Sequence, residues 1–226
     1  EAVYNLKRQY GYYPQLARTT LHLTQGNRRF SEIGAMAGIH ATDWSWAALL
    51  ADLDNDGWKD LFVTNGIYRR PNDLDYIDYV MTEKPQAGRG RGTGEENVAL
   101  MARMPRGAVP NYAFRNEGAS ESRFGQVPRF ADRSAAWGLD RDDFSNGAAY
   151  ADLDNDGDLD LVTNNINAPA ALYENRADTL ADHHYLAVHL EGEGGNTQGI
   201  GATVYLVQGE RRQVLEQQPS RGFQSS

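Results

Sequence analysis

The chain of 226 residues contains no cysteine. This absence excludes disulfide frameworks, zinc ribbons, iron–sulfur clusters and thiol nucleophiles, because all of them need cysteine sulfur. The five histidines show no HExxH or other paired spacing of a metal site. A Gly-x-Ser-x-Gly nucleophile motif is absent as well. We therefore expect that this chain is not an enzyme.

Basic residues are in the minority, with 22 Lys and Arg against 31 Asp and Glu and a net charge of −9. Nucleic acids and anionic membrane surfaces are bound through Lys and Arg, so neither is expected as a partner. Long apolar runs and a signal-peptide pattern are also missing, so we expect no membrane insertion in this segment. Because the chain begins with Glu1 and not with Met, we interpret it as a piece of a longer protein.

An internal repeat organises the sequence. Residues 30–65 align with residues 130–165 without a gap, and sixteen of the 36 aligned positions are identical. The segment Ala51–Gly57 recurs unchanged as Ala151–Gly157. This level of identity is far above chance and indicates a duplicated structural unit.

Each copy predicts two strands joined by an acidic loop, because aromatic and β-branched residues alternate with Asn, Asp and Gly clusters. These strands are predicted at 44–51 and 60–64 in the first copy, and at 144–151 and 160–163 in the second. Further strands are predicted at 19–26, 111–118, 170–175, 185–190, 202–207 and 212–216.

The segment between the two copies predicts a helical insert. One capped helix is expected after Pro71-Asn72-Asp73 and another from Glu95 to Met104, joined by a Gly- and Arg-rich loop at 88–94. We therefore predict a first repeat in 1–65, the insert in 66–110, a second repeat with the start of a third blade in 111–181, and a β-rich region in 182–226.

The acidic loops have the composition of a cation site. Aspartate occupies positions 1, 3, 5 and 9 of each loop, and glycine at position 6 allows a sharp bend. Several like charges repel one another unless a cation compensates them, and calcium accepts six to eight oxygen ligands. The carbonyl of position 7 can supply a further oxygen. Magnesium prefers a smaller octahedron, and zinc prefers nitrogen or sulfur.

Two alternatives to this calcium hypothesis were weighed. An EF-hand requires a bidentate Glu at position 12 and flanking helices, but Val63 and Thr163 stand at that position and the flanks predict strands. A solvated turn is the other alternative, because Asp and Asn favour turns in general. Two full copies in the same register favour the metal site over the turn.

The pattern Asp-x-Asp-x-Asp-Gly-x-x-Asp-Leu after a strand of small residues resembles the FG-GAP or VCBS-type repeat, the calcium-binding blade of β-propeller proteins. The strand at Asn111–Gly118 is similar to the blade opening of that family. The resemblance implies about two bound calcium ions. The implied ligands are Asp52, Asp54, Asp56, Trp58 and Asp60 in the first loop, and Asp152, Asp154, Asp156, Asp158 and Asp160 in the second, with Trp58 and Asp158 at position 7 contributing their backbone carbonyls.

The C-terminal segment, from Gly195 to Ser225, resembles the start of an ASPIC/UnbV domain. That module follows such repeats in cartilage acidic protein and in bacterial relatives. The expected fold is therefore mainly β: a partial β-propeller of antiparallel blades with calcium loops, a short helical insert and a β-rich C-terminal piece.

The resemblance also implies a function. We expect a calcium-binding repeat module of a secreted, cell-surface or periplasmic protein, acting in adhesion or in recognition of an extracellular protein or carbohydrate. The alternative is a non-catalytic recognition or scaffold part of a larger extracellular hydrolase or lyase.

Overall fold

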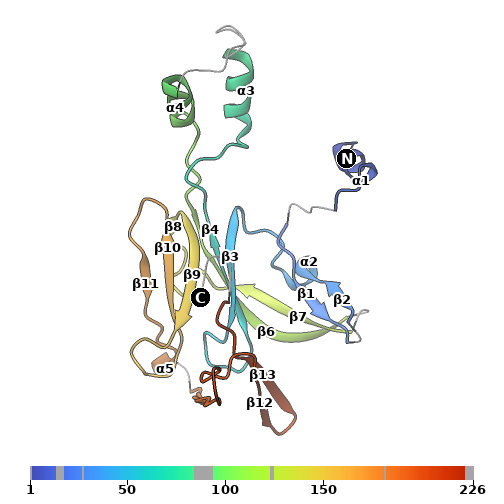
Figure 1. Ribbon diagram of the computed structural model, residues 1–226, viewed down its shortest axis with the longest axis vertical. Helices are drawn as coiled ribbons and strands as arrows, with labels where there is room; N and C mark the ends of the chain where they lie inside the picture. Colours follow the sequence, from blue (N-terminus) through green and yellow to red (C-terminus); the bar gives the residue numbers. More distant parts are fainter. Residues whose placement is uncertain are drawn as a thin grey trace.

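The computed structural model describes residues 2–13, 18–26, 28–83, 94–122, 125–180 and 182–221. Strands predominate over helices, which confirms the mainly β class (Figure 1). The strands are β1 (His22–Thr24), β2 (Phe30–Glu32), β3 (Ser45–Ala51), β4 (Asp60–Asn65), β5 (Val109–Pro110), β6 (Tyr112–Ser122), β7 (Gly125–Asp132), β8 (Asp142–Asp143), β9 (Ser145–Ala151), β10 (Asp160–Asn165), β11 (Ala171–Tyr173), β12 (Thr203–Gln208) and β13 (Arg211–Glu216). The helices are α1 (Ala2–Gln9), α2 (Gly34–Ala37), α3 (Leu74–Glu83), α4 (Gly94–Ala102) and α5 (Ala177–Leu180).

Two antiparallel sheets carry the duplicated segments. The first has the strand order β3-β4-β6-β7, and the second has the order β9-β10-β11. The pairing register is the same in both, since Ala51 faces Asp60 and Ala151 faces Asp160. The sequence repeat is therefore a structural repeat. Strand β6 pairs with β4, so the first sheet combines residues from both sides of the insert.

The two sheets pack against each other through small and aliphatic side chains (Figure 1). Ala47 and Leu49 of β3 and Phe62 of β4 meet Ala148 and Leu161 of the second sheet in one buried cluster. A second buried cluster covers the opposite side of the first sheet. It joins that sheet to the segment that carries β1, β2 and α2, so the described strands form layers that follow the chain order.

The insert forms the two predicted helices, α3 and α4, which extend away from the sheets (Figure 1). Asp73 caps α3, because its Oδ1 accepts a hydrogen bond of 2.9 Å from the backbone N–H of Tyr76. The guanidinium of Arg103 lies 4.7 Å from the ring centre of Tyr79, which holds the helices together. Most of the predicted 88–94 loop lies outside the described residues.

The C-terminal region differs in part from the prediction. Strands β12 and β13 form the expected hairpin, but the strand predicted at 185–190 is wrong. The side chains of Tyr185, Leu186 and Val188 are more than half exposed, and no described strand pairs with this segment. A strand needs a hydrogen-bonded neighbour, which this segment lacks in the described part of the chain.

Within the described residues, the sheets stay separate, and none closes on itself into a barrel or a propeller ring. No described helix has the length and apolar character needed to cross a bilayer.

A chain of buried polar groups joins the two main sheets. Asn111 is 1% exposed, and its Oδ1 accepts a hydrogen bond from the backbone N–H of Asn65 at 2.9 Å. Its Nδ2 donates to Ser145 Oγ at 3.0 Å, and this hydroxyl in turn donates to Asn165 Oδ1 at 2.7 Å. Asn111 thus connects the first sheet to the second through groups that water does not reach.

We predict that Asn111→Ala lowers the free energy of unfolding by about 2 kcal/mol or more, because it leaves a buried N–H without an acceptor and a buried hydroxyl without a donor. Urea denaturation followed by circular dichroism measures this loss. The exposed Asn72 offers the matched control. Asn72→Ala should change stability by less than about 0.5 kcal/mol. Equal stabilities of the two variants would contradict the connecting role of Asn111.

Candidate metal centre

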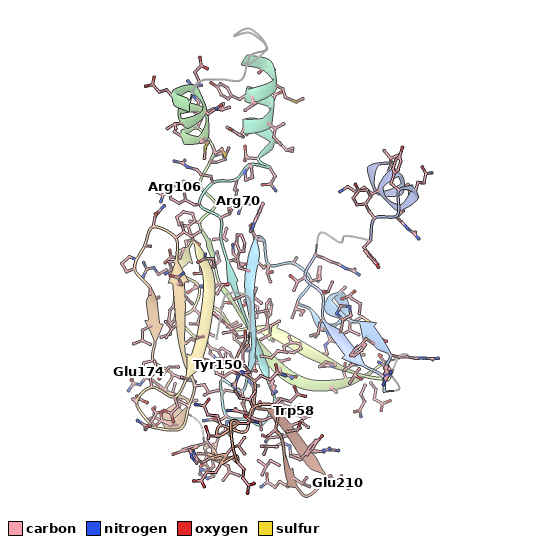
Figure 2. All side chains as sticks on the ribbon, in the orientation of Figure 1. Trp58, Arg70, Arg106, Tyr150, Glu174 and Glu210 are labelled. Carbon is pink, nitrogen blue, oxygen red and sulfur yellow. The ribbon has the colours of Figure 1, made fainter. Side chains whose placement is uncertain are left out.

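The two aspartate loops follow β3 and β9 and lie side by side. They are linked directly, because Asn55 Nδ2 donates a hydrogen bond of 3.3 Å to the carbonyl of Gly157. Figure 2 shows Trp58 and Glu174 toward this end of the molecule, and Arg70 and Arg106 toward the insert at the other end. The candidate site therefore joins two adjacent sheets at one rim.

Both loops share the hydrogen bond that closes their bend. Oδ2 of the first aspartate accepts from the backbone N–H of the glycine, at 2.9 Å for Asp52 with Gly57 and at 3.2 Å for Asp152 with Gly157. The two glycines have φ values of 90° and 95°, in a region that residues with a side chain rarely adopt. The first aspartate of each loop thus holds the bend that the glycine makes possible.

The last aspartate of each loop connects its own loop to a segment on the other side of its strand. Oδ1 of Asp60 accepts from the backbone N–H of Asn116 at 2.8 Å, and Oδ1 of Asp160 accepts from that of Asn175 at the same distance. The other oxygen of each carboxylate accepts a backbone N–H of its own loop at 3.0 Å. Because these contacts are equivalent, Asn116 of the first sheet corresponds to Asn175 of the second.

This correspondence exposes a difference in charge between the loops. The residue before Asn116 is Arg115, whereas the residue before Asn175 is Glu174. Arg115 donates from Nε to Asp54 Oδ2 at 2.5 Å and from Nη2 to Asp56 Oδ2 at 2.7 Å. In the part of the chain that the structure describes, no ion pair reaches the aspartates of the second loop. The first loop therefore has a cationic partner of its own, and the second does not.

Seven of the predicted ligands, together with Asp178, form three groups of carboxylates. Within each group, one oxygen from each residue lies within 4.8 Å of the others. The groups are Asp52, Asp54 and Asp60; Asp152, Asp154 and Asp156; and Asp156, Asp158 and Asp178. Each group offers only oxygen, which suits a hard divalent cation such as calcium.

Some predicted ligands lie outside the group of their own loop. Asp56 faces Arg115 instead, and Asp160 does not belong to the second group. The side chain of Asp158 belongs to the third group. The side chain of Trp58 is 43% exposed, and the roles of the Trp58 and Asp158 carbonyls stay predictions.

Three residues of the site were not predicted. Arg115 and Glu174 occupy matching places in two short strands that share an Asn, so an alignment of these strands would have revealed the charge difference. Asp178 corresponds to Ala119 in the same alignment, so the repeat contains no matching acidic residue that would have indicated Asp178.

Burial changes the titration of the first loop. It raises the pKa of Asp52 to about 6 and that of Asp60 to about 7, and the negative charges of Asp54 and Asp56 add to both shifts. The backbone N–H groups that bind these carboxylates act in the opposite direction but do not cancel the effect of burial. The centre therefore holds negative charge at a cost in free energy.

Comparison with known proteins supports one part of the resemblance. Residues 192–226 match the family described as ASPIC and UnbV. No curated protein matches the chain. The matched segment contacts the candidate site, since the guanidinium of Arg211 lies 5.9 Å from the Trp58 ring centre and a Cβ on Gly57 would lie 2.7 Å from Gln213 Nε2. Arg221 Nη1 also donates to the hydroxyl of Tyr150 at 2.6 Å.

We predict that the metal-free protein loses stability as pH rises from about 4 to about 7. Asp52 and Asp60 bind protons more tightly in the folded chain than in the unfolded chain, because their folded pKa values are raised to about 6 and about 7. Their protonation therefore stabilises the fold at low pH, and this contribution is lost as pH rises through those values. The two pKa shifts correspond to about 7 kcal/mol at full strength, and solvent screening at the rim reduces the expected loss to on the order of 3 kcal/mol, measured by urea denaturation in EDTA.

Asp60→Asn provides the control for this pH dependence. The amide cannot accept both backbone hydrogen bonds of Asp60, so the variant should be less stable at every pH. It should nevertheless show a shallower slope between pH 5 and 8. A slope equal to that of the parent would show that Asp60 does not titrate in this range.

Proposed function

We propose that the chain is a calcium-binding repeat module of the FG-GAP or VCBS type. One observation carries this proposal: two loops with identical aspartate spacing fold with equivalent hydrogen bonds and each brings three carboxylates together. Repulsion among these carboxylates is relieved when a divalent cation binds between them. Two such loops on adjacent sheets would let calcium stiffen one rim of the molecule.

The propeller is part of the same proposal. The four-stranded sheet β3-β4-β6-β7 is an antiparallel meander, the form of a propeller blade. The second sheet repeats its first three strands and packs against it. These features support an arc of blades as the architecture of the module.

We further propose that the module serves adhesion or recognition of an extracellular protein or carbohydrate in a secreted, cell-surface or periplasmic protein. The duplication of the loops favours this role over catalysis, because structural cation sites recur from blade to blade whereas an active site is normally unique in its fold. The alternative is a non-catalytic scaffold part of a larger hydrolase or lyase. That scaffold would use the same calcium sites, so a calcium titration tests the sites for either role.

Calcium titration tests the proposal. For the EDTA-stripped protein, we expect one calcium ion in each of the two aspartate loops, about two in these loops together, with dissociation constants on the order of 0.1–1 mM in calorimetry. At 10 mM calcium, each occupied site should add about 1.4–2.7 kcal/mol to the free energy of unfolding. Asp54→Ala and Asp154→Ala should each abolish the calcium-dependent stabilisation that comes from the mutated loop. The control variant Asp78→Ala, at an exposed position of α3, should leave the calcium-dependent stabilisation unchanged. If calorimetry shows no binding heat and EDTA does not change the melting temperature, the calcium proposal is refuted.

The charge difference between the loops predicts unequal affinities. Arg115 competes with a cation for Asp54 and Asp56, whereas Glu174 adds negative charge at the equivalent position. Arg115→Gln should therefore strengthen calcium binding to the first loop about tenfold or more, measured in an Asp154→Asn background.

The matched change in the second copy is Glu174→Gln, measured in an Asp54→Asn background. It should weaken calcium binding to the second loop by less than about tenfold, because Glu174 is exposed and its charge is screened by solvent. Unchanged affinity in Arg115→Gln would show that the arginine and the cation do not compete.

A further inference from the structure

The second aspartate loop contains a buried carboxylate oxygen without a partner. Asp158 is fully buried, at 0% exposure, and its Oδ1 forms no hydrogen bond. Its Oδ2 accepts the backbone N–H of Asp178, at 3.2 Å. A buried ionised oxygen is costly unless a proton, a donor or a metal ion compensates it. The buried oxygen of Asp158 therefore favours a cation beside it.

Two further carboxylates converge on this residue. One oxygen from each of Asp156, Asp158 and Asp178 lies within 4.8 Å of the other two. Asp156 also accepts the backbone N–H of Asp158 at 3.2 Å, which holds the two residues in place. Asp178 lies in α5, outside both aspartate loops, so this cluster spans two separate segments of the chain.

A cavity of about 260 Å³ opens onto the cluster between the two loops. Asp156 and Asp178 line it together with Asn55, His183, His184 and Tyr185. His183 is held there because its Nδ1 lies 2.6 Å from the carbonyl oxygen of Asp54. This space provides an access path and room for the water ligands that a cation with three protein carboxylates would keep.

We infer that Asp156, Asp158 and Asp178 form a further binding site for a hard divalent cation, separate from the loop centres and sharing Asp156 with the second loop. It belongs to the second copy alone, because the corresponding positions in the first copy are Trp58 and Ala119. The ligand class rests on the proposed function, whereas the location rests on the buried oxygen of Asp158.

Oxygen chemistry selects the class of cation. The three carboxylates provide only oxygen ligands, and neither histidine of the cavity belongs to the cluster. Calcium tolerates such an irregular oxygen set, whereas zinc and copper favour nitrogen or sulfur. In the described residues, no Lys or Arg forms an ion pair with any of the three aspartates.

Calcium counting by native mass spectrometry, with calorimetry in parallel, tests the inference. Asp178→Ala should bind one calcium ion fewer than the parent protein, and Asp178→Asn should bind the same ion more weakly, because the first removes a ligand that belongs to neither loop and the second removes only its charge. Asp154→Ala removes a ligand of the second loop only, so it should lose a different ion. The double variant should then lose two. Asp182→Ala, on an exposed neighbouring position, should bind as many ions as the parent.

The outcomes separate this inference from the proposed function. A parent that binds no calcium refutes both. A parent that binds calcium while Asp178→Ala binds the same number refutes only the further site. A double variant that loses one ion in total also refutes it, because a single ion would then be shared between the loop and Asp178.

A second variant keeps the inference testable if the Asp178 variant fails to fold. Asp158→Asn should bind more weakly the ion that Asp178→Ala loses, and in EDTA it should melt at a higher temperature than the parent. The amide replaces the uncompensated buried oxygen and can donate to Asp156. A lower melting temperature of Asp158→Asn in EDTA, with calcium binding unchanged, would overturn the assignment.

Discussion

Repulsion between carboxylates held close together is the constraint on which the rest of the structure depends. The loops do not relieve it by spreading, because their aspartates are fastened by backbone N–H groups. Asp60 and Asp160 each bind their own loop and the neighbouring strand, so they form part of the sheets as well as of the site. The geometry that builds the sheets thus also concentrates negative charge at one rim. The proposed cation binding would therefore be linked to stability through the same residues.

The two copies meet this constraint in different ways. In the first, Arg115 reaches from β6 into the loop and compensates two aspartates. In the second, Glu174 takes the equivalent place, and Asp158 and Asp178 bring still more negative charge. The duplicated unit has thus diverged into one loop with an arginine partner and another without an ion-pair partner in the described part of the chain. The backbone hydrogen bonds of the last aspartate are equivalent in both copies, so the difference in charge arises from the side chains around them.

Local patterns in the sequence predicted most of the fold and the centres of both loops. The strands β3, β4, β9 and β10 and the helices α3 and α4 follow from periodicity, turn residues and the cap at Asp73, all of which act over a few residues. Arg115 and Asp178 were missed because they reach the loops through pairing between distant strands and through packing of α5. The strand predicted at 185–190 failed for a related reason, since its pattern is correct but no partner strand lies beside it in the described chain. These three features depend on which segments lie next to each other in the folded chain, and local sequence patterns do not contain that information.

The insertion of α3 and α4 between two paired strands has a consequence for how this architecture can vary. Leu61 of β4 and Phe114 of β6 are direct neighbours in the sheet, although the whole insert separates them along the chain. The entropy of closing such a connection grows only logarithmically, so doubling its length costs about 0.6 kcal/mol. This junction can therefore accept other sequences at little thermodynamic expense, while the aspartate rim at the opposite end stays unchanged. The two ends of the molecule thus differ in how much change of sequence and length the fold can tolerate.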